Sequence, residues 1–323
     1  MERTPISPVL PSTRPSTQVQ RSVAQAAAYF ELTKPRVVAL IVFTAVVGML
    51  LATPGSITPQ VFVCATLGIS LAAGAAAAFN HVLDRRADAI MARTRARPLP
   101  SSLLSTRQAS LFGAALTAVA GLTLLFGVNT LTAILTLLTI VGYSVVYTVI
   151  LKPLTPQNIV IGGAAGAAPP VLGWTAITGE VTLDAMLLFL IVFVWTPPHF
   201  WALALYREKD YASANIPMLP VTHGSAYTRR QMLGYTVALA AVCVLPYATG
   251  MSGPVYLIGA LALNLRFVAY AWQLHTSYSD ALARRMFRFS IHYLAALFAL
   301  LLLDRLLMSY RGELQSVLFA LVQ

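Results

Sequence analysis

The sequence predicts an all-α, polytopic membrane protein with nine transmembrane helices. Of its 323 residues, 58% are hydrophobic and only 10% are charged, whereas a soluble domain carries about 25% charged residues. A soluble fold of this size cannot bury so much apolar surface, which excludes the water-soluble classes. A membrane helix needs about 20 mainly apolar residues. Nine such runs follow one another along the chain: 37–53, 60–82, 108–127, 130–151, 157–177, 183–205, 232–250, 254–274 and 288–308.

The basic residues predict how these spans are oriented. Nineteen of the 22 Lys and Arg residues precede the first span or follow the second, fourth, sixth and eighth spans. Because cytoplasmic connections are enriched in Lys and Arg, we expect the N-terminus in the cytoplasm and the C-terminus outside. In a soluble chain a net charge of +11 would suggest a nucleic-acid partner. Here it fits loops that face anionic lipid, so we expect a lipid bilayer and no nucleic acid.

The chain divides into one long apolar region and two terminal tails. Residues 1–30 are polar and contain four prolines, which predicts a disordered cytoplasmic tail. Residues 31–310 contain all nine runs and form the expected intramembrane domain, and residues 311–323 form a C-terminal tail. The longest connections, 84–107 and 206–230, are charged and are expected to be loops on the cytoplasmic side.

A first acidic cluster lies at the cytoplasmic end of the second span. Asn80, Asp84 and Asp88 are spaced four residues apart, so they share one face if the helix continues through this stretch. Two carboxylates one turn apart repel each other, and a Mg²⁺ ion shared with substrate phosphates would relieve that repulsion. Arg93 and Arg97 repeat the spacing and are placed to donate to the phosphates. The alternative is a solvated loop with weak Asp–Arg surface pairs.

A second acidic cluster, Glu208 and Asp210, lies at the corresponding end of the sixth span. Alone, it would be interpreted as a loop with neutralised charges. Two acidic clusters at the same end of a helical bundle can instead share metal ions and one diphosphate. Lys152 and Lys209 are expected at the same level, where they would help the arginines to neutralise a leaving diphosphate.

Several separated motifs resemble a known family. The pattern NxxxDxxxDxxMxRTxxRP at 80–98 resembles the first aspartate motif of the intramembrane, UbiA-type prenyltransferases. Its tail, which reads RTxxRPLP, and the stretch TPPHFW at 196–201 resemble the branch that farnesylates heme. Further similar stretches lie at 32–36, 147–152, 162–170 and 206–220, and the resemblance covers about residues 30–310.

The resemblance implies a nine-helix bundle around a central cavity that opens sideways to lipid. It implies a Mg²⁺-dependent enzyme of the bacterial inner membrane that transfers the farnesyl group of farnesyl diphosphate to a vinyl group of heme b, with addition of water. Downstream heme-modifying or terminal-oxidase assembly proteins are implied as partners. Because the second family motif is commonly DxxxD and Tyr206 stands at its first position here, only Asp210 is carried over from it.

The resemblance also assigns roles to particular residues. The implied catalytic residues are Asn80, Asp84, Asp88 and Asp210, and the three aspartates among them are the implied metal ligands. The implied substrate-binding residues are Arg93, Arg97, Lys152, Lys209, Tyr206, Tyr211 and His199.

His199 follows Pro197 and Pro198 in the cytoplasmic half of the sixth span. An ionisable side chain inside the membrane is functional by default, and here it would contact heme through the iron or a propionate. The alternative is a histidine that only hydrogen-bonds across helices.

Two rival functions remain open. A secondary transporter shares the hydrophobicity and the helix-breaking Gly and Pro residues, but its ionisable groups usually lie near the membrane midplane, whereas here they lie at one face. A related prenyltransferase that acts on a quinone-type aromatic is the second rival, and the RTxxRPLP and PPHFW stretches favour heme over it.

Overall fold

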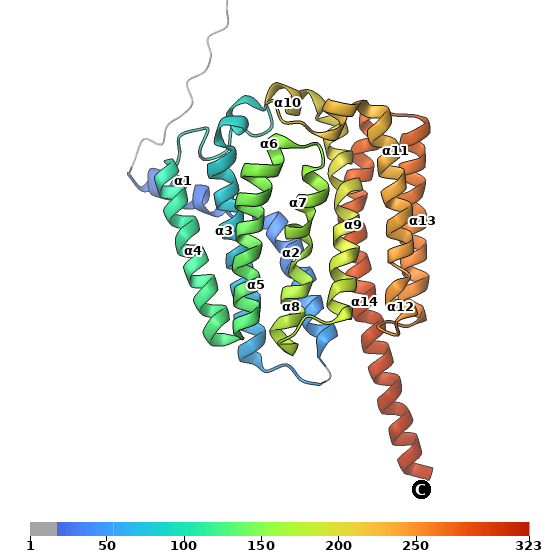
Figure 1. Cartoon of the computed structure of the whole chain (residues 1–323). Helices are drawn as coiled ribbons and strands as arrows, with labels where there is room; N and C mark the ends of the chain where they lie inside the picture. Colours follow the sequence, from blue (N-terminus) through green and yellow to red (C-terminus); the bar gives the residue numbers. More distant parts are fainter. Residues whose placement is uncertain (1–17, 54, 323) are drawn as a thin grey trace, which may run out of the picture.

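The computed structural model describes residues 18–53 and 55–322, and the side chains of all of these except 19–20 and 311–322. The regular structure in this part of the chain is helical throughout, with no strand. It contains nine segments long and apolar enough to cross a membrane, which confirms the predicted all-α, nine-span fold (Figure 1). The segments are Pro35–Ala52, Pro59–Ile90, Thr106–Gly127, Thr130–Leu154, Asn158–Thr178, Leu183–Tyr206, Leu219–Ala248, Pro254–Thr276 and Asp280–Tyr310.

Five spans are single helices: α2 (Pro35–Ala52), α3 (Pro59–Ile90), α4 (Thr106–Gly127), α9 (Leu183–Tyr206) and α13 (Pro254–Thr276). Three spans consist of consecutive pieces: α5 (Thr130–Val141) with the π-helix η1 (Gly142–Leu151) and α6 (Lys152–Leu154); α7 (Asn158–Ala167) with α8 (Pro169–Thr178); and α11 (Leu219–Val242) with α12 (Leu245–Ala248). The last span is the first part of α14 (Asp280–Val322), and the shorter helices α1 (Gln18–Leu32) and α10 (Glu208–Ser213) lie outside the spans.

The structure differs from the sequence-based expectation in the two tails. Helix α1 covers part of the segment that was expected to be disordered, because its alanine-rich sequence favours helix and it buries Ala28 and Leu32 against α3 and α4. Residues 1–17 lie outside the described residues. Helix α14 continues to Val322, past the tail boundary expected at residue 310. The division into three regions stays a prediction.

The two long charged connections are also more helical than predicted. Helix α3 continues to Ile90, which meets the condition for Asn80, Asp84 and Asp88 to share a face. The segment 206–230 was predicted to be a loop, which is wrong: it contains α10 and the start of α11. Pro220 at the beginning of α11 has its φ angle preset for a first helical turn and gives up no needed hydrogen bond.

Both charged connections lie at one end of the bundle. Figure 1 shows the α3–α4 connection, α6 and α10 together at this end, with the C-terminus at the opposite end. The charged clusters can therefore belong to one site. The side of the membrane that this end faces, and the lateral opening of a central cavity, stay predictions.

Close backbone contact holds α2 against α8 near the centre of the bundle. A Cβ atom on Gly48 would overlap the carbonyl oxygen of Pro170, and one on Gly173 would overlap that of Ala45. Small residues let membrane helices approach this closely. At the far end of the bundle, the buried Asp304 of α14 accepts backbone hydrogen bonds from Gly253 and Tyr256, and thereby caps α13.

Candidate active site

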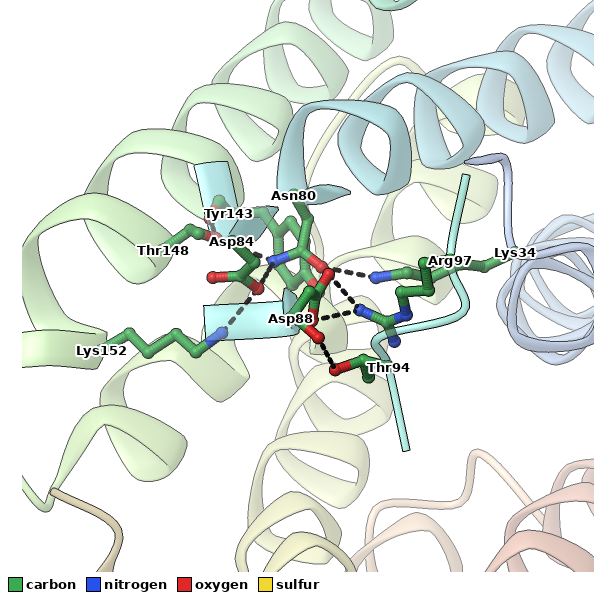
Figure 2. A network of polar contacts seen from close by, with 9 residues as sticks. All are labelled: Lys34, Asn80, Asp84, Asp88, Thr94, Arg97, Tyr143, Thr148 and Lys152. Carbon is green, nitrogen blue, oxygen red and sulfur yellow. Dashed lines mark hydrogen bonds and ion pairs between the residues drawn. The ribbon is translucent and has the colours of Figure 1, made fainter. Parts of the chain in front are cut away.

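One face of α3 carries three buried polar side chains in a row. Asn80, Asp84 and Asp88 are only 4%, 9% and 1% exposed. The Nδ2 atom of Asn80 donates to Oδ2 of Asp84 at 2.7 Å (Figure 2). The predicted ladder is therefore present, and it is buried within the bundle. The alternative of a solvated loop is wrong for these three residues.

Three cations from different parts of the chain surround this ladder. Lys152 lies 2.6 Å from Oδ2 of Asp84, and Nη1 of Arg97 donates to both oxygens of Asp88 at 2.8 Å (Figure 2). Lys34, at the start of α2, donates to Oδ1 of Asn80. Three basic side chains thus lie around two carboxylates in a buried region. Buried charge is costly unless it is matched, so this site is suited to an anionic ligand.

Arg97 reaches Asp88 because the chain turns back after α3. The helix ends at Ile90, and the hydroxyl of Thr94 donates to the backbone carbonyl of Asp88 at 3.0 Å. Arg93 and Arg97 lie in these turns, so they do not form the expected four-residue pair on a helix. Arg97 enters the site, whereas Arg93 is exposed.

The π-helix η1 supplies a further wall of the site. The hydroxyl of Thr148 bonds to the carbonyl of Tyr143, five residues earlier, and accepts a long contact of 3.5 Å from Asn80. Figure 2 shows the ring of Tyr143 beside Asp84. Lys152 follows directly after η1. A π-helical turn includes an additional residue and is frequent at functional sites.

The ammonium group of Lys34 depends on its surroundings for its charge. Burial and the neighbouring Arg97 lower the pKa of Lys34 to about 7. An anion placed beside Lys34 would favour its charged form and raise that pKa again. The surroundings of Lys34 therefore favour a ligand of high negative charge.

The oxygen donors of the α3 face fit a hard divalent cation. Such ions prefer carboxylate, carbonyl and phosphate oxygens. Oδ2 of Asp84 is already bonded to Asn80 and Lys152, whereas Oδ1 accepts no hydrogen bond from the described residues. No three His, Cys, Asp or Glu side chains come together anywhere in the described part of the chain. A bound Mg²⁺ would accordingly take its remaining ligands from water or substrate phosphates.

The second cluster has a different character. Asp210 forms a local pair with Arg207 at 3.3 Å, and the structure does not join it to Asp84 and Asp88 as one group of metal ligands. Lys209 is exposed on α10. Tyr211 is buried in an apolar cluster that includes Met91.

His199 lies in a stack of aromatic rings between α9 and α14. Its ring stacks on Trp195 at 4.2 Å and on Phe287 at 4.7 Å, measured between ring centres. Its Nδ1 atom lies 2.7 Å from the hydroxyl of Ser290. Its Nε2 atom forms no hydrogen bond within the described residues, and the residue is 8% exposed. This nitrogen is therefore available to a ligand.

Four residues of the site are not among those predicted from the sequence: Lys34, Tyr143, Thr148 and Ser290. Lys34 carried a signal, since it precedes Pro35 at a helix start within a family-like stretch. The three others carried none. A π-helix has no sequence period that would reveal it, and Ser290 reaches His199 across 91 residues of chain.

Buried carboxylates among basic side chains, at one end of a bundle of membrane helices, are typical of an intramembrane site for an anionic ligand. The UbiA prenyltransferase family matches residues 41–302. The chain belongs to this family, and it is a prenyltransferase with several transmembrane helices.

Curated relatives narrow the comparison. The chain is 59% identical over 289 residues to the protoheme IX farnesyltransferase of Thiobacillus denitrificans, which covers 90% of this chain and 97% of the relative. It is 61% identical over 282 residues to the protoheme IX farnesyltransferase of Aromatoleum aromaticum, covering 87% and 92%.

Solved structures share the fold at low sequence identity. Digeranylgeranylglyceryl phosphate synthase superposes with a TM-score of 0.72 at 18% identity, covering 87% of this chain and 98% of that one. A UbiA homolog from Archaeoglobus fulgidus, bound to DMAPP and Mg²⁺, has a TM-score of 0.59 at 17% identity, covering 84% and 98%.

Proposed function

We propose that this chain transfers the farnesyl group of farnesyl diphosphate to a vinyl group of heme b, with addition of water, giving heme O and diphosphate. The observation that carries the proposal is the buried pair Asp84 and Asp88 under three cations, which is a site for a diphosphate. The relatives named protoheme IX farnesyltransferase, at up to 61% identity, support heme as the acceptor over a quinone-type aromatic.

The chain's own cations perform the first task, which is to hold the leaving group. Lys34, Arg97 and Lys152 are placed to bind the diphosphate oxygens and to accept the negative charge that grows as the allylic C–O bond breaks. A Mg²⁺ ion bound at Asp84 and Asp88 would neutralise further charge on the same oxygens. The relative solved with DMAPP and Mg²⁺ supports the use of this metal.

The second task is to direct the cationic fragment to its acceptor. The electrons of the broken C–O bond leave with the diphosphate, and the terminal vinyl carbon of heme b bonds to C1 of the farnesyl group. Water then adds to the adjacent carbon and loses a proton. The apolar interior of the bundle keeps other water away from the fragment until the new carbon–carbon bond has formed.

The acceptor is assigned to the aromatic stack around His199. The accessible Nε2 atom of His199 can contact the iron or a propionate, and Ser290 holds the ring in place through Nδ1. Asp210 is proposed as an additional ligand on the diphosphate side, because it occupies the second family motif.

Purified protein incubated with heme b, farnesyl diphosphate and Mg²⁺ tests the proposal, with products identified by mass. We expect the mass of heme b to increase by one farnesyl group and one hydroxyl group. A quinone-type aromatic supplied in place of heme b should remain unchanged. Prenylation of the aromatic with no reaction of heme b would overturn the assignment of the acceptor.

We also propose that the site end of the bundle faces the cytoplasm, in the inner membrane of a bacterial cell. Single cysteines at the exposed positions Ser102 and Ser213, in a background without Cys64 and Cys243, should react with an impermeant reagent only from the cytoplasm. A cysteine at exposed Ser56, at the opposite end, should react only from outside. The reverse pattern would invert the topology.

A further inference from the structure

A group of arginines gathers around Tyr206, where the polar end of α9 meets α14. The guanidinium carbon of Arg284 lies 4.9 Å from the centre of the Tyr206 ring, and that of Arg207 lies 5.6 Å from it. The charges of Arg93 and Arg288 also act on this phenol group. Arg284 and Arg288 are one helical turn apart on α14, so they share a face.

In this arginine cluster, only Arg207 has an ion-pair partner among the described residues. Arg207 is paired with Asp210, but its Nε atom is buried and has no acceptor among the described residues. Arg284 and Arg288 are exposed and form no ion pair within the described part of the chain. The cluster is therefore suited to an anion, and the planar fork of arginine matches a carboxylate.

The cluster continues directly into the aromatic stack of the candidate active site. The ring of Tyr206 lies edge-on to Phe287 at 6.4 Å, and Phe287 stacks on His199 at 4.7 Å. Along the contact between α9 and α14, the arginines at the polar end are therefore followed by the rings of Tyr206 and Phe287 and then by the imidazole of His199. Charged groups followed by apolar rings are complementary to a flat apolar molecule that carries carboxylates on one edge.

We propose that Arg284 and Arg288 bind the two propionate carboxylates of the heme acceptor, whose macrocycle lies along Phe287 and His199. The inference rests on the proposed function and adds the residues that select and orient the acceptor. The vinyl groups of heme b lie on the edge remote from the propionates. Anchoring the carboxylates at the polar end therefore directs the vinyl edge into the apolar layer, where the farnesyl cation is protected from water.

The affinity of the protein for heme b, compared with its affinity for a heme whose two carboxylates are esterified, tests this role. Absorbance titrations would compare heme b with its dimethyl ester, using protein in nanodiscs of uncharged lipid. The wild-type protein should bind heme b more tightly than the ester. Arg284→Gln and Arg288→Gln should each weaken heme b binding about tenfold or more, the size of one charge-assisted hydrogen bond, and leave ester binding unchanged. Arg285→Gln is the matched control, and it should alter neither affinity.

The KM for farnesyl diphosphate separates this role from two others. Under the proposal it stays within about twofold of wild type in both variants, a change smaller than a single hydrogen bond would produce. A raised KM with unchanged heme affinity would assign the arginines to the diphosphate and overturn the proposal. So would a loss of heme affinity seen only in nanodiscs of anionic lipid, which would assign them to lipid headgroups.

The inference and the proposed function can fail separately. Equal binding and equal farnesylation of heme b and its ester, unaffected by either arginine variant, would overturn the inference and leave the function standing. A wild-type protein that neither binds nor farnesylates heme b would overturn both.

Discussion

Two charged clusters lie at the same end of the bundle, and they are built in opposite ways. In the α3 cluster, the side chains of Asp84 and Asp88 are 11% and 2% exposed, and those of their partners Lys152 and Arg97 are 12% and 20% exposed. In the α9–α10 cluster, Asp210 pairs with Arg207 only three residues away, and these side chains are 23% and 35% exposed.

The two clusters differ in how firmly the fold holds their charges in place. The α3 pairs join elements 9 and 68 residues apart, so the whole fold fixes their positions before a ligand arrives. Preorganised charge of this kind is effective in stabilising a leaving group. The α9–α10 pair is local and partly hydrated, and such pairs contribute little by themselves. We therefore expect the α3 cluster to dominate turnover.

The largest expected effect is the loss of either α3 carboxylate. Asp84→Asn and Asp88→Asn should each lower the rate of farnesyl transfer by at least about 10²- to 10³-fold, the scale seen when one preorganised electrostatic group is removed. The rate of product formation in reconstituted vesicles measures this. Normal turnover in either variant would remove that residue from the mechanism.

A double variant separates chemistry from folding. Asp88→Asn leaves Arg97 without its buried partner, which costs about 3–5 kcal/mol of stability when a buried pair is broken. Asp88→Asn combined with Arg97→Gln removes both charges and should recover most of the thermal stability. Activity should stay low in the double variant, because neither charge is restored.

The next effect concerns the cations of the two clusters. Lys152→Met removes an ammonium group bonded to Asp84 at 2.6 Å and should raise the KM for farnesyl diphosphate about ten- to hundredfold. Lys209→Met, on the exposed surface of α10, should raise it by no more than about threefold, since exposed charges are well hydrated. Equal effects would show that Lys209 reaches the diphosphate.

A smaller effect is expected at the aromatic stack. His199→Ala should weaken heme b binding about three- to tenfold, because it removes the Nε2 contact to heme and loosens the aromatic stack that holds the acceptor, and change the heme absorbance spectrum if the ring contacts iron. Affinity for farnesyl diphosphate should be unchanged. Wild-type heme affinity and spectrum in this variant would return His199 to a packing role.

The smallest effect is expected at Asp210. Asp210→Asn breaks a partly exposed pair, and it should weaken Mg²⁺-dependent binding of farnesyl diphosphate about fivefold or less without changing heme affinity. A loss as large as that of Asp84→Asn would instead make Asp210 an obligatory metal ligand. The Mg²⁺ concentration for half-maximal activity distinguishes these outcomes.

Much of the fold followed from composition and periodicity. All nine predicted runs overlap the observed spans, because a membrane helix must be apolar over its whole length whatever it packs against. The errors lie where that constraint ends. The helices at α1, α10 and the start of α11 are outside the apolar runs, so their existence depends on local packing.

The candidate site was predicted in part. The α3 ladder follows from four-residue spacing, which is a property of the helix itself. Its partners Lys34 and Lys152 lie 46 and 68 residues from it in the sequence, and no local pattern encodes such a distance. The expected helical pair Arg93 and Arg97 failed because α3 ends at Ile90.

By itself, the sequence determined that this chain crosses a membrane nine times and collects its charges at one end, because hydrocarbon tolerates neither unsatisfied backbone nor solvated charge. It also determined which face of α3 carries the carboxylates. Only the tertiary structure decided which cations meet them, that three face two, and that His199 stacks between Trp195 and Phe287. Those facts depend on how separate helices pack, and packing brings together residues whose separation along the chain carries no information about their distance in space.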